Sequence, residues 1–185
     1  MLLTEPGDAQ MDTVISKLGL PLVVKPNGAG SSVGVAVVRR PEELAGRVAA
    51  AADVEGGGVL CEEFIGGREF TVALLEEQPL PLLEILTSRE FFDYTAKYSD
   101  ENTEVNATAE LPAAVAAEIE KIAVRAAVCL GVRGLSRVDL RLDAASRPWL
   151  LEVNTLPGMT RTSLAPNAAR RAGLSLAALC DWMMQ

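Results

Sequence analysis

Two carboxylates and one amide lie at a spacing that could bind a divalent cation. Between residues 134 and 142, polar and apolar side chains alternate as in a β-strand, and Asp139 belongs to the polar set. In the segment 149–154, Glu152 and Asn154 are two residues apart, so on a strand they share one face. The three side chains therefore predict an oxygen-rich cluster if the two strands pair.

A hairpin that turns within residues 143–148 would place Asp139 opposite Glu152, and Arg137 opposite Asn154. Two facing carboxylates repel unless a positive charge lies between them. The chain has no histidine, so the donors here are oxygens, which suit Mg²⁺ or Mn²⁺. On spacing alone, a solvated polar face of an antiparallel sheet fits equally well.

A glycine-rich loop, residues 27–34, follows Lys25. Its glycines and serines expose backbone N–H groups that can hold phosphate oxygens, and the lysine adds a positive charge. The lysine precedes the glycines, so this is not a Walker A loop. A strand expected at 35–38 excludes a Rossmann turn. The pattern resembles a flap over a nucleotide, although taken alone it is more often a flexible hairpin loop.

Two weaker features support nucleotide chemistry. Glu62, Glu63 and Phe64 lie at the end of an expected strand, and residues 66–69 suit a hinge between two lobes. The loop 155–160 directly follows the Glu-x-Asn strand, where backbone N–H groups could meet an oxyanion. Together with the phosphate loop and the carboxylate pair, these features suggest an ATP-dependent enzyme without a P-loop.

The order of elements predicts an α+β fold with mainly antiparallel strands. Strands are expected at 22–25, 35–38, 59–64, 70–75, 82–86, 134–142 and 149–154, and helices near 14–18, 41–52, 112–130, 163–172 and 175–184. The first ten residues are expected to form a loose terminus. Residues 88–110 are expected to form a long functional loop, because four of the aromatic side chains lie there.

Composition excludes several classes of protein. The formal net charge of −8 argues against nucleic acid or an anionic membrane as a partner. Without histidine, Ser-His-Asp and Cys-His catalysis and histidine-ligated metals are excluded. We expect the three cysteines to be reduced core residues. We see neither a signal peptide nor a membrane span, so we expect a cytoplasmic protein.

These segments together resemble the D-alanine–D-alanine ligases of the ATP-grasp superfamily. The resemblance covers five motifs in the family's order, at 25–34, 62–72, 91–98, 134–139 and 151–160. It implies an ATP-grasp fold of two small lobes, whose mainly antiparallel sheets are flanked by helices, with the nucleotide between them. Residues 1–62 would form part of the central lobe with its glycine-rich flap. Residues 63–185 would form the C-terminal lobe with the metal and substrate sites.

The resemblance also implies a role for each matching residue. The residues that would bind ATP are Lys25 and Lys97 at the phosphates, Glu62, Glu63, Phe64 and Ile65 around the adenine, and Glu69 at the ribose. Two Mg²⁺ or Mn²⁺ ions would be held by Asp139, Glu152 and Asn154, the last of which would also contact ATP. The residues that would act on the substrates are Arg137 and Gly158 at the tetrahedral intermediate, Ser163 and Leu164 at the second alanine, and Ser31 and Tyr98 in closing the site.

The activity implied is ATP-dependent ligation of two D-alanines through D-alanyl phosphate, for peptidoglycan precursor synthesis. A D-alanine–D-lactate ligase is a nearby alternative, although Tyr98 directly after Lys97 resembles the dipeptide-forming members. The family's N-terminal lobe, which supplies groups for the first alanine, has no counterpart here, and residues 1–18 are too short to replace it. A nucleotide-binding module without turnover is therefore the alternative of a different class. We expect D-alanine as the small-molecule partner and a homo-oligomer as the assembly.

Overall fold

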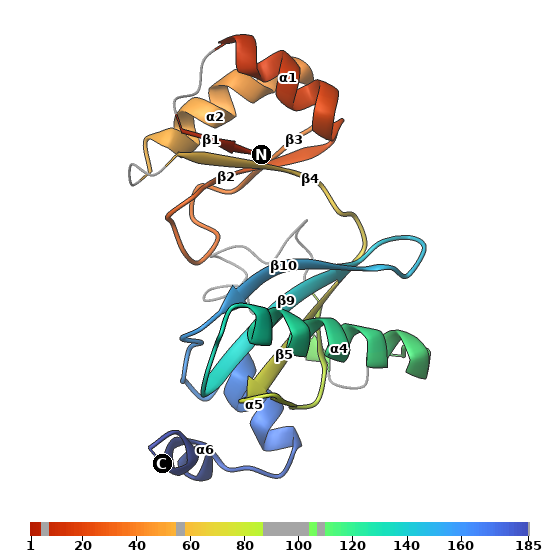
Figure 1. The fold of residues 1–185 in the computed structure, drawn as a ribbon, viewed down its shortest axis with the longest axis vertical. Helices are drawn as coiled ribbons and strands as arrows, with labels where there is room; N and C mark the ends of the chain where they lie inside the picture. Colours follow the sequence, from red (N-terminus) through yellow and green to blue (C-terminus); the bar gives the residue numbers. More distant parts are fainter. Residues whose placement is uncertain (5–7, 55–57, 87–103, 107–109, 185) are drawn as a thin grey trace. The chain divides into compact units, whose positions relative to one another are not determined.

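A computed structural model describes residues 1–4, 8–54, 58–86, 104–106 and 110–184 of the chain (Figure 1). These residues form two compact units, which are described separately. Unit 1 contains the described residues up to Phe64, and unit 2 contains those from Ile65 onward. The assignment of these units to the family's central and C-terminal lobes stays a prediction.

Unit 1 is a four-stranded antiparallel sheet with helices on one face (Figure 1). Its strands, in spatial order, are β1 (Leu2–Leu3), β4 (Val59–Glu63), β2 (Leu22–Pro26) and β3 (Ala36–Val38). Its helices are α1 (Asp8–Leu18), the 3₁₀ turn η1 (Pro41–Glu43) and α2 (Leu44–Ala52). Alternate residues of β2 and β4 are buried with apolar side chains of both α-helices, so one face of the sheet forms the core of this unit.

The prediction of a loose terminus was wrong. Leu2 and Leu3 pair with Leu60 and Val59, Leu3 is buried, and α1 begins at Asp8. The N-terminal amino group of Met1 donates to the carbonyl of Cys61. The apolar Leu3 side chain enters the core and its backbone completes the edge of the sheet, so these residues gain both burial and hydrogen bonds.

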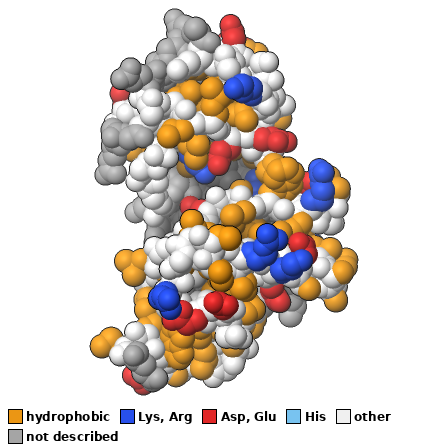
Figure 2. Space-filling model, in the orientation of Figure 1, with side chains coloured by type: hydrophobic (Ala, Val, Ile, Leu, Met, Phe, Trp, Pro, Cys, Tyr) orange, Lys and Arg blue, Asp and Glu red, His pale blue; other side chains and the backbone are white. Residues whose placement is uncertain are grey.

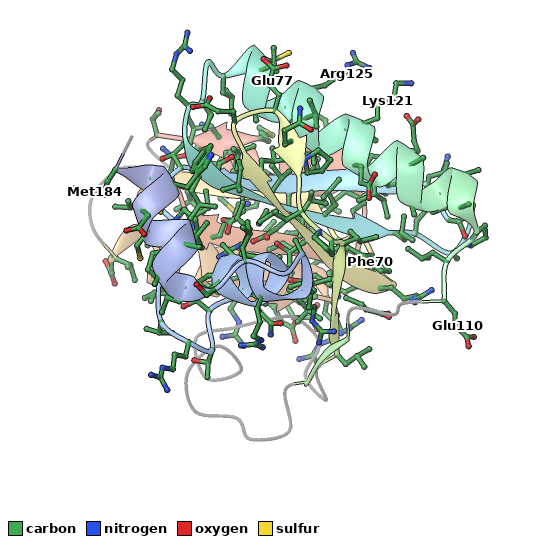
Figure 3. All side chains as sticks on the ribbon, turned by 90° about the horizontal axis from the view of Figure 1, so that it is seen from below. Phe70, Glu77, Glu110, Lys121, Arg125 and Met184 are labelled. Carbon is green, nitrogen blue, oxygen red and sulfur yellow. The ribbon has the colours of Figure 1, made fainter. Side chains whose placement is uncertain are left out.

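Unit 2 is a six-stranded antiparallel sheet between helices. Its main path is β10 (Pro148–Asn154), β9 (Leu135–Leu142), β5 (Arg68–Leu75), β7 (Leu83–Leu86) and β8 (Glu104–Asn106), and β6 (Gln78–Pro79) pairs with β5. Its helices are α4 (Ala113–Cys129), α5 (Leu164–Arg171) and α6 (Leu176–Met183). Figure 3 shows α4 and α5 on opposite sides of this sheet.

The core of unit 2 lies between α4 and one face of the sheet. Phe70, Val138 and Leu140 are fully buried there against Ile119 and Ala123 of α4. The charged residues of α4 point away from this core, as Lys121 and Arg125 show in Figure 3. Because side chains alternate along a strand, burial of one set on this face directs the intervening polar residues of β5 and β9 to the opposite face.

Two further expectations need correction. β8 lies within the segment expected to be a loop and pairs with β7 through Glu84↔Asn106 and its neighbours; three residues are too few to show a periodicity. Cys61 is a buried core residue, and burial raises the pKa of its thiol, but Cys129 and Cys180 are exposed. Both lie on the outer faces of helices, where a small apolar residue is not forced inward.

Candidate active site

The polar face of the unit 2 sheet contains buried charges. Arg137, Asp139 and Arg141 alternate along β9 and are each at most 9% exposed. On β5, Thr71 lies directly opposite Asp139, and on β10 Glu152 lies directly opposite it from the other side. Buried charges are expensive unless they are paired, so their contacts define what this face can do.

Asp139 is the centre of a dense hydrogen-bond network. Its Oδ1 accepts from Thr71 Oγ1 at 2.6 Å and from Arg137 Nε at 2.8 Å, and its Oδ2 accepts from Arg137 Nη2 at 2.7 Å. The same Nη2 lies 3.6 Å from Oε1 of Glu152. The guanidinium of Arg137 therefore lies between the two facing carboxylates and compensates their repulsion.

The predicted pairing of the hairpin is confirmed, but its path differs. Asp139 pairs with Glu152 and Arg137 with Asn154. Nearer the turn, Leu142 pairs with Pro148, so the turn is one residue shorter than expected. A shift of register between Leu150 and Glu152 restores the predicted partners. Such a bulge places two residues of one strand opposite one of the other.

The donor set of this hairpin fits a hard divalent cation. Asp139, Glu152 and Asn154 offer carboxylate and amide oxygens on adjacent strands, which is the chemistry Mg²⁺ and Mn²⁺ prefer. Oδ1 of Asn154 accepts from the backbone N–H of Leu156 at 3.0 Å, which fixes the orientation of the amide. In the described part of the chain no three acidic or thiol side chains cluster, so the amide oxygen is needed to complete such a set.

A second polar row lies next to this cluster on the same face. Glu69 is opposite Arg141, and its Oε2 lies 3.5 Å from Arg141 Nε. Nη1 of Arg141 donates to the carbonyl oxygen of Ile65 at 2.9 Å. Glu69, which was predicted to bind the ribose, is thus paired with a buried arginine. Ile65, which was predicted at the adenine, contacts the same arginine through its backbone carbonyl.

The loop after β10 brings two other predicted residues together. A side chain added at Gly158 would place its Cβ 2.9 Å from Oγ of Ser163, so only glycine fits there without a shift. Ser163 Oγ accepts from the N–H of Thr160 at 3.1 Å and shares a hydrogen bond of 2.8 Å with its hydroxyl. Ser163 precedes α5, and Leu164 is the first helical residue with its side chain buried. Any contact of Leu164 with a ligand would therefore use its backbone N–H.

Unit 1 brings Lys25 and Glu62 together. Both lie on the sheet face opposite the helices, and Lys25 Nζ is 2.5 Å from Oε2 of Glu62. Glu63, the next residue, belongs to the other face of β4, so its side chain does not join that of Glu62. The assignment of Glu62 and Glu63 to the adenine pocket stays a prediction, and their side chains would have to take part from opposite faces of β4.

Two other predicted residues, Phe64 and Ser31, belong to unit 1. The guanidinium carbon of Arg39 lies 5.8 Å from the centre of the Phe64 ring, a cation–π distance. Ser31 is exposed in the loop that joins β2 to β3, and it adopts a positive φ of 53°. The prediction of a glycine-rich loop between two strands is confirmed. Lys97 and Tyr98 lie outside the described residues.

Two residues of the polar face were not found from the sequence. Thr71 and Arg141 donate hydrogen bonds to Asp139 and Ile65, but neither was predicted to be a site residue. The available signal was alternation: polar residues at 69 and 71 interrupt an otherwise apolar strand, as do 137, 139 and 141 on its partner. Neighbouring strands with polar residues in phase predict a shared polar face.

Comparison with known proteins identifies the fold and the family. Solved structures with similar folds include a D-alanine–D-alanine ligase from Bacillus anthracis complexed with ATP, with a TM-score of 0.79, 30% identity, and coverage of 97% of this chain and 55% of that one. VanG D-Ala:D-Ser ligase from Enterococcus faecalis has a TM-score of 0.83 and 33% identity, with coverage of 96% and 52%. The protein therefore has the ATP-grasp fold.

Sequence relatives identify the family. The family model described as D-ala D-ala ligase C-terminus matches residues 3–185. A D-alanine–D-alanine ligase of Bordetella petrii is 46% identical over 178 residues, which are 94% of this chain and 54% of the relative. The ligase of a Synechococcus strain is 44% identical over 172 residues, with coverage of 92% and 53%. The chain belongs to the D-alanine–D-alanine ligase family, and it spans about half the length of the curated relatives it matches.

Proposed function

We propose that this chain is the ATP- and metal-binding part of a ligase that joins two D-alanines at the expense of ATP. The observation that supports this proposal most is the buried hydrogen-bond network of Arg137, Asp139 and Thr71, which faces Glu152. It occurs in a chain whose relatives are named D-alanine–D-alanine ligases. The reaction would begin with transfer of the γ-phosphoryl group to the carboxylate of one D-alanine. The amine of the second would then displace phosphate from the acyl phosphate.

Each residue of this chain would act by position and charge. Lys25 would neutralise phosphate charge, and Lys97 is proposed for the γ-phosphate. Asp139, Glu152 and Asn154 would hold two Mg²⁺ or Mn²⁺ ions, and bound divalent cations neutralise charge that develops on the transferred phosphoryl group. Arg137, already fixed by Asp139, would offer its guanidinium to the carbonyl oxygen that becomes negative.

The loop before α5 would hold the substrates. The N–H of Gly158 is proposed to stabilise the tetrahedral intermediate with Arg137, and Ser163 with the N–H of Leu164 would bind the carboxylate of the second alanine. The first N–H groups of a helix have no partner within the helix, and they attract anions. Ser31 and Tyr98 would join the glycine loop to residues 88–110 on closure. We expect this chemistry in the cytoplasm, as a step towards peptidoglycan, and by a homo-oligomer.

Two alternatives follow from specific observations. Because the chain covers 54% of its Bordetella petrii relative, it could bind ATP and metal without turnover. Because one solved neighbour is a D-Ala:D-Ser ligase, the second substrate could differ, with D-serine or D-lactate in place of D-alanine. The buried catalytic face is common to all three possibilities, so it does not define the acceptor.

The test is ADP release from Mg·ATP with and without D-alanine, measured for the chain alone and with the remaining part of the Bordetella petrii relative added as a separate chain. We expect D-alanine-dependent release in the second case, lost in Asp139→Ala and Arg137→Ala and retained in Lys121→Ala, whose side chain lies on the exposed face of α4 (Figure 3). ATP binding without release under any condition would instead support the binding module. Analysis of the product across pH with D-alanine, D-serine and D-lactate identifies the acceptor.

A further inference from the structure

Lys25 and Glu62, which the proposed function assigns to the phosphates and the adenine of one nucleotide, form an ion pair. Lys25 is opposite Leu60 on β4, and Glu62 is opposite Val23 on β2, so the two charged residues are diagonal neighbours on the sheet. The other residues of this face, Val23, Val37 and Leu60, are apolar and half-buried. A single opposite-charge pair thus stands on an apolar strip that has no other polar side chain from these three strands.

The chemistry of the pair leaves both partners able to bind more. An ammonium group has three N–H donors and a carboxylate has two oxygens, each with acceptor sites. The contact between Nζ and Oε2, at 2.5 Å, uses one donor and one oxygen. The lysine can therefore donate to phosphate oxygens, and the carboxylate can accept from the amino group of a nucleobase, without separating from each other.

We propose that Glu62 is a positioning residue that links recognition of the base to recognition of the phosphates through Lys25. This inference rests on the proposed ATP binding. It adds that binding of the base strengthens binding of the phosphates, and the reverse. Adenine that binds the carboxylate fixes Glu62, and Glu62 in turn holds the Lys25 ammonium where phosphate meets it. A triphosphate alone has to immobilise the lysine itself.

The exposure of the two side chains sets the size of this coupling. Lys25 and Glu62 are 27% and 40% exposed, so burial does not fix either side chain in the absence of ligand. Immobilising one long side chain on binding costs about 0.5–1.5 kcal/mol, which corresponds to a change of about two- to tenfold in Kd. When one ligand has already fixed the pair, the second binds more tightly by that factor, and the effect is reciprocal.

The experiment measures binding of inorganic tripolyphosphate to the full chain by calorimetry, with and without saturating adenosine. We expect adenosine to lower the Kd of tripolyphosphate about two- to tenfold. Purine riboside, which lacks the amino group, should give no change. In Glu62→Ala the effect of adenosine should disappear, whereas in Glu118→Ala it should persist, because Glu118 forms an exposed pair with Lys121 on α4.

The remaining outcomes overturn the inference in distinguishable ways. If ATP binds but adenosine and tripolyphosphate bind independently, or tripolyphosphate does not bind alone, the inference is wrong and the proposed function stands. If the coupling survives in Glu62→Ala, another group transmits it. If ATP itself does not bind to a folded chain, both the inference and the proposed function fail.

Discussion

The two units hold their charged residues in opposite ways. In unit 1, the Lys25 and Glu62 side chains are 27% and 40% exposed and meet through one contact. In unit 2, the Arg137 and Asp139 side chains are 9% and 7% exposed, and Asp139 accepts three hydrogen bonds from two neighbours. The first pair can adapt to a ligand, whereas the second is fixed before any ligand arrives.

Under the proposed function, this difference suits the two sheets to different roles. A preorganised guanidinium stabilises charge that develops during a reaction, because its orientation costs nothing at that moment. A half-exposed lysine suits a ligand that arrives from solvent and has to be released afterwards. Hydrophobic atoms are visible on the surface of both units in Figure 2. Met183 and Met184 are among the exposed hydrophobic side chains of unit 2.

The largest effect is expected from removing the acidic partner of Arg137 in unit 2, and removal of the acidic partner of Lys25 in unit 1 is the comparison. Asp139→Ala leaves a buried guanidinium without its carboxylate, and such changes cost about 3–5 kcal/mol. Glu62→Ala opens a half-exposed pair, which costs at most about 1 kcal/mol. Both tryptophans lie in unit 2, so urea unfolding followed by their fluorescence reports on that unit, and far-UV circular dichroism reports on the whole chain. A loss below about 1 kcal/mol for Asp139→Ala would contradict the contrast between the units.

A smaller effect is expected from Thr71→Val, which keeps the shape of the side chain and removes the donor to Asp139. Loss of a hydrogen bond to a buried charged group costs about 1.5–3 kcal/mol. Thr71→Ser should recover most of it, since the hydroxyl is retained. Thr71→Val should also weaken Mn²⁺ binding, measured by electron paramagnetic resonance, and Thr71→Ser should restore most of it. Unchanged stability and Mn²⁺ affinity in Thr71→Val would show that Arg137 alone orients the carboxylate.

Asp143 tests the turn that connects the two strands of the site. Its carboxylate accepts from the backbone N–H groups of Arg147 and Ala145 and from the side chains of Trp149 and Arg147. These hydrogen bonds, led by that from the Arg147 backbone, lower its pKa from 3.8 to about 2. A depressed carboxyl pKa stabilises the fold above the unfolded pKa, and this contribution is lost as pH falls through the folded one.

The stability of the native protein relative to Asp143→Asn should therefore be constant from neutral pH down to about 4 and should shrink between about pH 4 and pH 2. We expect a smaller difference than for Thr71→Val, because the turn is at the surface. Unfolding measured across pH for both proteins gives the answer. A difference that does not change below pH 4 would mean that the charge of Asp143 is not what holds the turn.

The smallest effect is expected from Ser136→Ala. Ser136 is fully buried on the core face of β9, opposite Leu74, and its hydroxyl has no hydrogen-bond partner among the described residues. Removing an unpaired buried hydroxyl should leave stability unchanged or raise it by up to about 1 kcal/mol. Thr71→Val, the same kind of change on the other face, serves as the comparison. A clear loss of stability in Ser136→Ala would reveal a partner for this hydroxyl.

The sequence predicted the elements that repeat a pattern and missed those that do not. The helices and long strands follow apolar periodicity, and the partners of Asp139 and Arg137 followed from their spacing. β6, β8 and β1 have two or three residues each, too few for a period, and their strand form depends on the neighbour they pair with. The side chains of Glu62 and Glu63 point to opposite faces because successive side chains alternate along a strand. A motif that lists both acids does not show this difference.

The register shift between Leu150 and Glu152 changes which residues of β10 face which residues of β9. Before it, odd residues of β10 face odd residues of β9, as Trp149 faces Arg141; beyond it, even faces odd, as Glu152 faces Asp139. Leu151 is the extra residue that separates these two registers. If Leu151 instead took part in a regular ladder, Glu152 and Asn154 would turn towards the apolar core and Val153 towards the buried charges. Deletion of Leu151 alone would keep Leu150 opposite Leu140 and Glu152 opposite Asp139, so this position should accept many substitutions and even the loss of its one extra residue.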